Sequence, residues 1–191
     1  MGRWEPNGRG RLAQAALELY AEQGFEQTTV AEITARAGLT ERTFYRHFAD
    51  KREVLFHGSE PAQELLVRTV ADAPAGASAL DAVTSALEAF GGRLQENPER
   101  VLLREAVMSA NTELRERELT KLAGLAAVLA GALRDRGTPE PAASLAAEAG
   151  IAVFKVAFAR WVTEPARADL PGVIRAAAEE LSALVLEQPG P

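Results

Sequence analysis

Arg42 and Arg46 lie four residues apart in a short segment that also holds two phenylalanines, Phe44 and Phe48. At about 100° per residue along a helix, the phenylalanines share one face and the arginines point the opposite way. A helix held by two aromatic residues, with guanidinium groups and small hydroxyls on its free side, has the size and chemistry to enter a DNA major groove about 12 Å wide. A plain amphipathic helix with a solvated charged face would show the same two arginines.

The residues around this segment have the order expected of two short helices joined by a tight turn. Thr29 and Glu32 form a capping-box signature for a first helix. Gly38 can end that helix because glycine tolerates the left-handed conformation, and Thr40 can cap the second helix. The stretch from Thr29 to Phe48 therefore predicts a DNA-reading helix-turn-helix.

A further helix is expected before this pair. Residues 1–9 are polar and glycine-rich, which predicts a flexible arm that either stays mobile or reaches into a minor groove. Gly24 is placed to end the helix that follows the arm. Its apolar residues have helical spacing, and they are Leu12, Ala15, Ala16, Leu19 and Tyr20.

A fourth helix should follow the pair and run to about Ala73. Asp50 and Glu53 give it an N-terminal cap signal. Pro61 should interrupt this helix, because a proline removes a hydrogen bond and collides with the preceding turn. We therefore expect a kink or break at Pro61, with Ser59 capping the second half.

The remaining apolar patterns also have helical spacing. They predict helices over 78–95, from residue 97 onward, over 112–136 and over 145–162, and a last helix from Asp169. The 145–162 helix carries only three charges, on Glu148, Lys155 and Arg160, so it must be covered on more than one side. No stretch alternates with the period of two that strands show. The fold class predicted is all-α, with about nine helices.

From Leu12 to Phe56 the chain resembles the N-terminal domain of the tetracycline-repressor (TetR) family of bacterial transcription regulators. The residues that carry the resemblance are Gly24-Phe25, Thr29, Ala37-Gly38 and the run Phe44-Tyr45-Arg46-His47-Phe48 followed by Lys51. The resemblance implies a three-helix DNA-binding domain over residues 1–50. It also implies a helical ligand-binding and dimerisation domain over 51–191, of which 51–73 form a connecting helix.

The resemblance further implies which side chains contact DNA. Arg42 and Thr43 would reach base edges, with Arg42 favouring guanine O6 and N7. Lys51 and the backbone N–H groups beside it would grip a phosphate, which agrees with the anion preference of helix N-termini. The full DNA-binding set is Thr28, Thr29, Thr40, Arg42, Thr43, Tyr45, Arg46, His47 and Lys51, in which Arg46 could serve either role.

In the TetR family the C-terminal domain encloses an inducer, and its last two helices form a four-helix bundle with a second copy. The ligand-binding candidates here are Phe90, Leu94, Leu103, Arg104, Met108, Asn111, Leu122, Leu125, Phe154 and Phe158. The dimer candidates are Ala149, Ala152, Val156, Ala177, Leu181 and Leu184. Few of the ligand candidates are polar, which favours an apolar or amphipathic small molecule, and the 102–161 segment loosely resembles regulators that sense acyl-CoA-like compounds. A filled hydrophobic core would give the same stripes.

Composition narrows the classes of function. The sequence has no cysteine, which excludes disulfides, thiolate zinc sites and a cysteine nucleophile. Its two histidines, His47 and His57, match no metal motif, so we predict no catalytic residue, metal or cofactor. The sequence starts without a signal-peptide pattern, and no uncharged stretch reaches the ~18 residues of a membrane span. We expect a cytoplasmic protein with no membrane partner.

The net charge of −6 is unevenly distributed. Residues 1–58 hold 8 basic and 8 acidic groups, whereas residues 59–191 hold 13 and 19. A neutral reading domain can still present a positive face if its acids point elsewhere. We predict a homodimeric repressor that a small-molecule inducer releases from a palindromic double-stranded DNA operator. An all-α enzyme and a helical interaction adaptor are the alternatives, and salt-dependent retention on DNA would distinguish them from a repressor.

Overall fold

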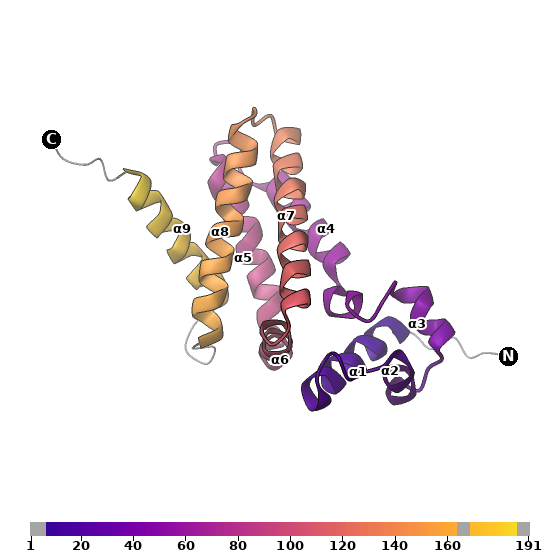
Figure 1. Ribbon diagram of the computed structural model, residues 1–191. Helices are drawn as coiled ribbons and strands as arrows, with labels where there is room; N and C mark the ends of the chain where they lie inside the picture. The colour runs from indigo at the N-terminus through magenta and orange to yellow at the C-terminus, as the bar shows by residue number, and fades with distance from the viewer. Residues whose placement is uncertain (1–6, 164–168, 187–191) are drawn as a thin grey trace. The chain divides into compact units, whose positions relative to one another are not determined.

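The computed structural model describes residues 7–163 and 169–186, and all regular structure within those ranges is helical (Figure 1). The helices are α1 (Gly8–Gln23), α2 (Val30–Ala37), α3 (Glu41–His47), the 3₁₀ helix η1 (Glu53–Phe56), α4 (Ser59–Asp72), α5 (Ala79–Gln95), α6 (Pro98–Ser109), α7 (Thr112–Asp135), α8 (Ala142–Thr163) and α9 (Leu170–Leu186). The all-α prediction is therefore confirmed. The predicted arm lies mostly outside the described residues, and its last two residues, Gly8 and Arg9, are helical.

These helices form two compact units. The N-terminal unit comprises the chain up to Glu60 together with Glu99–Arg117, and the C-terminal unit comprises Pro61–Pro98 together with the chain from Glu118 onward. Packing thus groups α6 and the first turn of α7 with the helix-turn-helix. The predicted boundary after residue 50, between a DNA-binding domain and a ligand-binding and dimerisation domain, stays a prediction.

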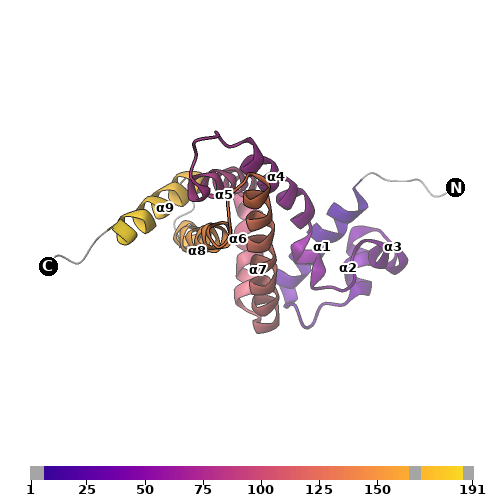
Figure 2. The same ribbon diagram turned by 90° about the horizontal axis from the view of Figure 1, so that it is seen from above.

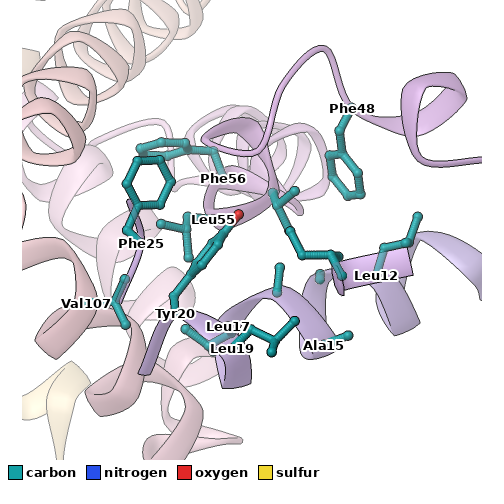
Figure 3. Close-up of a cluster of buried hydrophobic side chains, with 14 of the residues drawn as sticks. Leu12, Ala15, Leu17, Leu19, Tyr20, Phe25, Phe48, Leu55, Phe56 and Val107 are labelled. Atoms are coloured by element: carbon teal, nitrogen blue, oxygen red, sulfur yellow. The ribbon is translucent and has the colours of Figure 1, made fainter. Parts of the chain in front are cut away.

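The N-terminal unit is built on α1, which contacts α2, α3 and η1. Leu12, Ile33 and Phe44 are fully buried at the centre of its core. Tyr20 and Phe25 lie against each other edge to face, with ring centroids 5.1 Å apart (Figure 3). This shared core fixes the helix-turn-helix on α1, as the apolar spacing of the first helix predicts.

The break before α4 lies earlier than the sequence predicts. Asp50 Oδ1 accepts hydrogen bonds from the backbone N–H groups of Arg52 and Glu53, which confirms the cap signal, but only the short η1 follows. The chain then turns at Gly58, whose φ of 90° favours glycine. Pro61 is the third residue of α4, where a backbone N–H has no intrahelical partner, so the proline neither breaks nor kinks the helix.

In the C-terminal unit, α5, α8 and α9 pack side by side (Figures 1 and 2). Two glycines allow this close packing: a Cβ on Gly150 of α8 would lie 2.2 Å from Val83 Cγ1, and one on Gly91 of α5 would lie 2.8 Å from Ile174 Cδ1. Length and composition alone would allow α8 to cross a membrane, with a mean hydropathy of 1.6. Its contacts with α5 and α9 explain that apolar character as packing on more than one side, as predicted for 145–162.

Candidate nucleic-acid interface

The turn between α2 and α3 has the geometry that its sequence predicts. Thr29 Oγ1 accepts from the backbone N–H of Glu32, and Glu32 Oε2 accepts from the backbone N–H of Thr29, so the capping box is complete. Gly38 ends α2 in the left-handed conformation at φ 64° and ψ 36°. Thr40 caps α3 by accepting from the backbone N–H of Thr43 at 3.2 Å. Local hydrogen bonds thus fix both ends of the turn.

The two faces of α3 differ as predicted. Phe44 is fully buried and Phe48 nearly so, with ring centroids 5.5 Å apart, and together they hold α3 on the core. Arg42, Tyr45 and Arg46 are exposed, and Tyr45 has 58% of its surface accessible. A helix with one aromatic face and one cationic, hydroxyl-bearing face can enter a DNA groove without any change in its packing.

The exposed side of α3 carries two arginines, although this part of the sequence has no net charge. Among the residues that the structure describes, no carboxylate lies within ion-pair distance of Arg42 or Arg46. Three nearby acids pair with other arginines: Glu22 with Arg36 at 2.7 Å, Asp50 with Arg52 at 2.7 Å, and Glu53 with Arg117. Arg42 and Arg46 therefore remain available to an anionic partner, although the exposed carboxylate of Glu41 also lies on α3.

The threonines of the predicted set have local partners. Thr40 and Thr43 bring their hydroxyl oxygens to 3.0 Å, and Thr29 donates its hydroxyl to Glu32 Oε2 at 2.8 Å. Hydrogen bonds from the backbone N–H of Thr29 and then from its hydroxyl lower the pKa of the Glu32 carboxyl. The side chain of Thr28 is only 1% exposed and donates its hydroxyl to Gly24 O. Side-chain contact between Thr28 and a phosphate is therefore not supported, because burial leaves no surface for it.

His47 is half-buried beside Arg46, with Nε2 3.5 Å from Arg46 Nη2. Burial, followed by the charges of Arg46 and Arg9, lowers the pKa of the imidazole. His47 is therefore neutral near pH 7. In that state it can donate one hydrogen bond to a phosphate but adds no positive charge.

Lys51 has partners that sequence reasoning did not anticipate. Its Nζ donates to the backbone carbonyls of Phe25 at 2.8 Å, Glu26 at 3.2 Å and Thr28 at 3.0 Å. These contacts use all three donors of the ammonium group. The prediction that Lys51 grips a phosphate is not tested by this arrangement, but a phosphate would have to compete with these carbonyls.

A second missed contact lies at the other end of α2. Arg11 on α1 donates from Nη2 to the carbonyl of Ala37, next to Gly38. It thereby satisfies a carbonyl of the last turn, which has no partner within the helix. No local signal in the sequence marks this role, because Arg11 and Ala37 are 26 residues apart.

The ligand candidates fall into two groups. Phe90, Leu94, Leu122, Leu125, Phe154 and Phe158 belong to the C-terminal unit, where Phe90 and Phe158 flank Phe154 at centroid distances of 5.5 and 5.8 Å. Leu103, Arg104, Met108 and Asn111 belong to the N-terminal unit. There Met108 is fully buried in the core, Arg104 donates to Leu55 O, and Asn111 donates to Glu26. These four have structural partners that their helical spacing does not reveal.

The dimer candidates on α8 and α9 are mostly accessible. Ala152, Val156 and Leu184 are exposed, and Val156 and Leu184 have 49% and 69% of their surface accessible. Ala149 and Leu181 are half-buried. Ala177 is buried in the C-terminal unit itself, so it packs inside one copy of the chain.

The sequence of the helix-turn-helix matches that of a described family. Residues 12–57 match the profile of bacterial regulatory proteins of the tetR family. The chain carries the N-terminal domain of the TetR family. The matched segment begins in α1 and ends just after η1, so it contains all the α2 and α3 residues described above.

Individual relatives match only part of the chain in sequence. The HTH-type transcriptional regulator TcmR of Streptomyces glaucescens is 38% identical over 88 residues, which are 46% of this chain. The match covers 39% of the length of TcmR, so the chain spans well under half of this relative. The TetR relatives that resemble the chain in sequence are thus named as transcriptional regulators.

Solved structures extend the likeness to both parts of the fold. SmeT of Stenotrophomonas maltophilia, in a complex with triclosan, has a TM-score of 0.66 at 23% identity and covers 96% of this chain and 99% of its own. FadR of Bacillus subtilis, in complex with stearoyl-CoA, has a TM-score of 0.62 at 21% identity and covers 90% and 96%. At such identities the likeness establishes the fold, which is an N-terminal helix-turn-helix followed by a helical C-terminal part.

Proposed function

We propose that this protein is a transcriptional repressor that binds a palindromic DNA operator as a homodimer and releases it when a small apolar or amphipathic molecule binds. It would act in the bacterial cytoplasm. The observation that carries the proposal is the two-sided packing of α3. Phe44 and Phe48 fix the helix, while Arg42, Tyr45 and Arg46 are exposed and neither arginine pairs with a carboxylate of the described residues.

Arg42 is the residue for the decisive test of DNA reading. We expect Arg42→Ala to weaken operator binding by roughly 1–3 kcal/mol and to relax preference at one base pair. Arg36→Ala is the matched control, because Arg36 is an exposed arginine of α2 that pairs with Glu22. Binding would be measured by fluorescence anisotropy on duplexes that the wild-type chain selects from a random pool, and on random duplexes.

The outcome depends on the ratio of the two affinities. A loss for the selected duplex that exceeds the loss for random DNA supports base reading by Arg42. An unchanged ratio would mean that Arg42 contacts the phosphate backbone of DNA instead of a base. A wild-type chain without salt-dependent DNA binding would contradict the proposed function altogether.

A homodimer would place two copies of α3 about one DNA turn, roughly 34–36 Å, or a multiple of it apart. The exposed apolar residues of α8 and α9 offer the surface for that contact. We expect the double variant Val156→Glu and Leu184→Glu to be monomeric by light scattering and to lose operator binding. Both side chains are exposed within one copy, so the change should leave the fold intact. Leu119→Glu, at an exposed leucine of α7, is the control. A monomeric wild-type protein at micromolar concentration would contradict the dimer.

The aromatic row of the C-terminal unit supports an apolar ligand. Phe158 is half-buried between Phe154 and Trp161, with centroid distances of 5.8 and 6.1 Å. SmeT and FadR are described in complexes with triclosan and stearoyl-CoA, and both ligands have large apolar parts. We therefore propose the same chemical class here, with Phe90, Phe154 and Phe158 as its first contacts.

The test of the ligand uses stearoyl-CoA and triclosan as probes. Each is titrated into the full chain with and without operator DNA, because a ligand shifts the equilibrium only by its differential affinity for the two states. Operator should weaken ligand binding by the same factor by which ligand weakens operator binding. Phe158→Ala should reduce ligand affinity, whereas Leu119→Ala should not. Equal ligand affinity with and without operator would show a binding site that is not the switch.

A further inference from the structure

Lys51 follows α3 in the sequence, and its side chain contacts the loop between α1 and α2. We propose that Lys51 contributes to DNA binding as a positioning residue: it holds the loop between α1 and α2 through three backbone carbonyls, without itself binding a phosphate. The proposal rests on the proposed function, because it concerns how the helix-turn-helix is held ready for DNA.

The donors of Lys51 are fully used. Its Nζ lies 2.8 Å from Phe25 O, 3.2 Å from Glu26 O and 3.0 Å from Thr28 O, and an ammonium group has three N–H donors. These carbonyls belong to the turn between two helices, where no regular backbone ladder supplies partners. Phe25 O also accepts from the backbone N–H of Thr28, so Lys51 adds a second bond to that carbonyl and supplies a donor to the carbonyls of Glu26 and Thr28.

Both ends of Lys51 are held. Its Nζ lies 4.4 Å from the ring centroid of Phe25, which is buried and packs edge to face on Tyr20. Tyr20 in turn donates its hydroxyl to the backbone carbonyl of Lys51 at 2.6 Å. The side chain and the backbone of Lys51 are therefore fixed by the same aromatic pair, which leaves the ammonium little freedom to turn outward.

The loop that Lys51 holds determines where α2 begins. Thr28 donates its backbone N–H to Phe25 O and its hydroxyl to Gly24 O, and Thr29 follows directly as the cap of α2. A shift of the loop would move Thr29 and the first turn of α2. Since α2 joins α3 through a turn of a few residues, the orientation of the reading helix depends on that start.

Salt dependence separates positioning from direct contact. A lysine that neutralises a phosphate contributes about 0.9 to the slope of log K against log salt concentration, because its counterion is released. A lysine that only holds the loop weakens binding without changing that slope. The salt slope therefore distinguishes the two roles, even though loss of the lysine weakens DNA binding in either case.

The experiment compares Lys51→Met and Lys51→Arg with wild type on the selected duplex over a range of salt concentrations. Methionine keeps the length of the side chain without its donors. Arginine keeps the charge, but its planar fork cannot direct three donors from one atom. We expect both variants to bind roughly tenfold or more weakly with an unchanged salt slope. Arg46→Met is the control for a cation at the DNA surface, and its slope should fall by about 0.9 if Arg46 meets a phosphate.

Amide hydrogen exchange without DNA tests the structural half of the proposal. Residues 25–29 should exchange faster in both Lys51 variants, while the amides of α5 and α8 keep their protection and show that the fold is intact. A slope lower by about one in Lys51→Met, or near wild-type affinity in Lys51→Arg, would establish direct phosphate contact and overturn the proposal. Unchanged exchange in the loop would overturn it as well. A wild-type protein without specific DNA binding would refute the proposed function instead, and the exchange result would still decide the contact itself.

Discussion

The folded protein should lose stability in mild acid because of His57. Arg100 Nη2 lies 3.3 Å from both ring nitrogens of this half-buried histidine. Burial is the largest cause of its perturbation, and the charges of Arg100, Arg9 and Arg104 act in the same direction. Together they lower the pKa of His57 to about 4. The unfolded chain has no such environment, so its histidine takes up a proton near the ordinary value of about 6.5.

The direction and size of the stability change follow from this difference between the folded and unfolded pKa values of His57. Since the unfolded state binds more protons below pH 6.5, the stabilisation is present above about that pH and is lost as the pH falls toward the folded value of about 4. Between about pH 7.5 and about pH 5, linkage gives a loss of ~2 kcal/mol in the free energy of unfolding. Partial exposure of the ring to water reduces this to between about 1 and 2 kcal/mol.

Urea denaturation at both pH values measures this loss. His47 titrates too, and its pKa is also lowered, so the comparison is made in a His47→Gln background that leaves His57 as the single histidine. Adding His57→Gln keeps an acceptor for Arg100 but removes the titration. The free energy of unfolding of the variant that keeps His57, measured relative to that of the variant without it, should fall by about 1–2 kcal/mol at the lower pH, at fixed protein concentration. Equal losses in both variants would refute the assigned environment of His57.

Three further changes test the packing and the caps. Thr40→Ala should lower the free energy of unfolding by about 1 kcal/mol, because the backbone N–H of Thr43 loses its acceptor, and thermal denaturation would show it. Gly150→Ala should destabilise the C-terminal unit, since the new Cβ would lie 2.2 Å from Val83 Cγ1, and Val83→Ala in the same chain should restore part of the loss. Arg136→Met should cost roughly 1.5–3 kcal/mol in urea, because Arg136 donates to four carbonyls at the end of α4, and a change within error would contradict that role.

The parts of the fold that sequence predicts well depend on residues only a few positions apart. Thr29 and Glu32 complete a capping box, Gly38 takes the left-handed conformation, and Thr40 caps α3, all as predicted. Each of these features is decided within a window of three or four residues, where the chemistry of the side chain leaves few alternatives. Helical spacing likewise assigned Phe44 to the core.

The break before α4 shows where a local rule was applied at the wrong position. A proline disrupts a helix only if it takes the place of a hydrogen-bonded N–H, and Pro61 lies in the first turn, where none is needed. The turn occurs instead at Gly58, whose positive φ a larger residue would adopt only with strain. Pro61 alone led to the predicted break, whereas the structure places the turn at Gly58, three residues earlier.

The sequence predicts which face of α3 is exposed, but it does not predict which groups the other candidate side chains contact. Helical periodicity places Arg42 and Arg46 away from the core without any knowledge of the fold. It cannot show that Thr28 is buried, or that Lys51 meets carbonyls 23 to 26 residues away, because those contacts form only when α1, the loop and η1 pack together. The sequence does not show which acceptor a lysine meets, because a buried carbonyl can accept its hydrogen bonds as well as an exposed phosphate can. The role of a lysine beside a DNA-reading helix is therefore set by tertiary packing, and only its charge can be taken from the sequence.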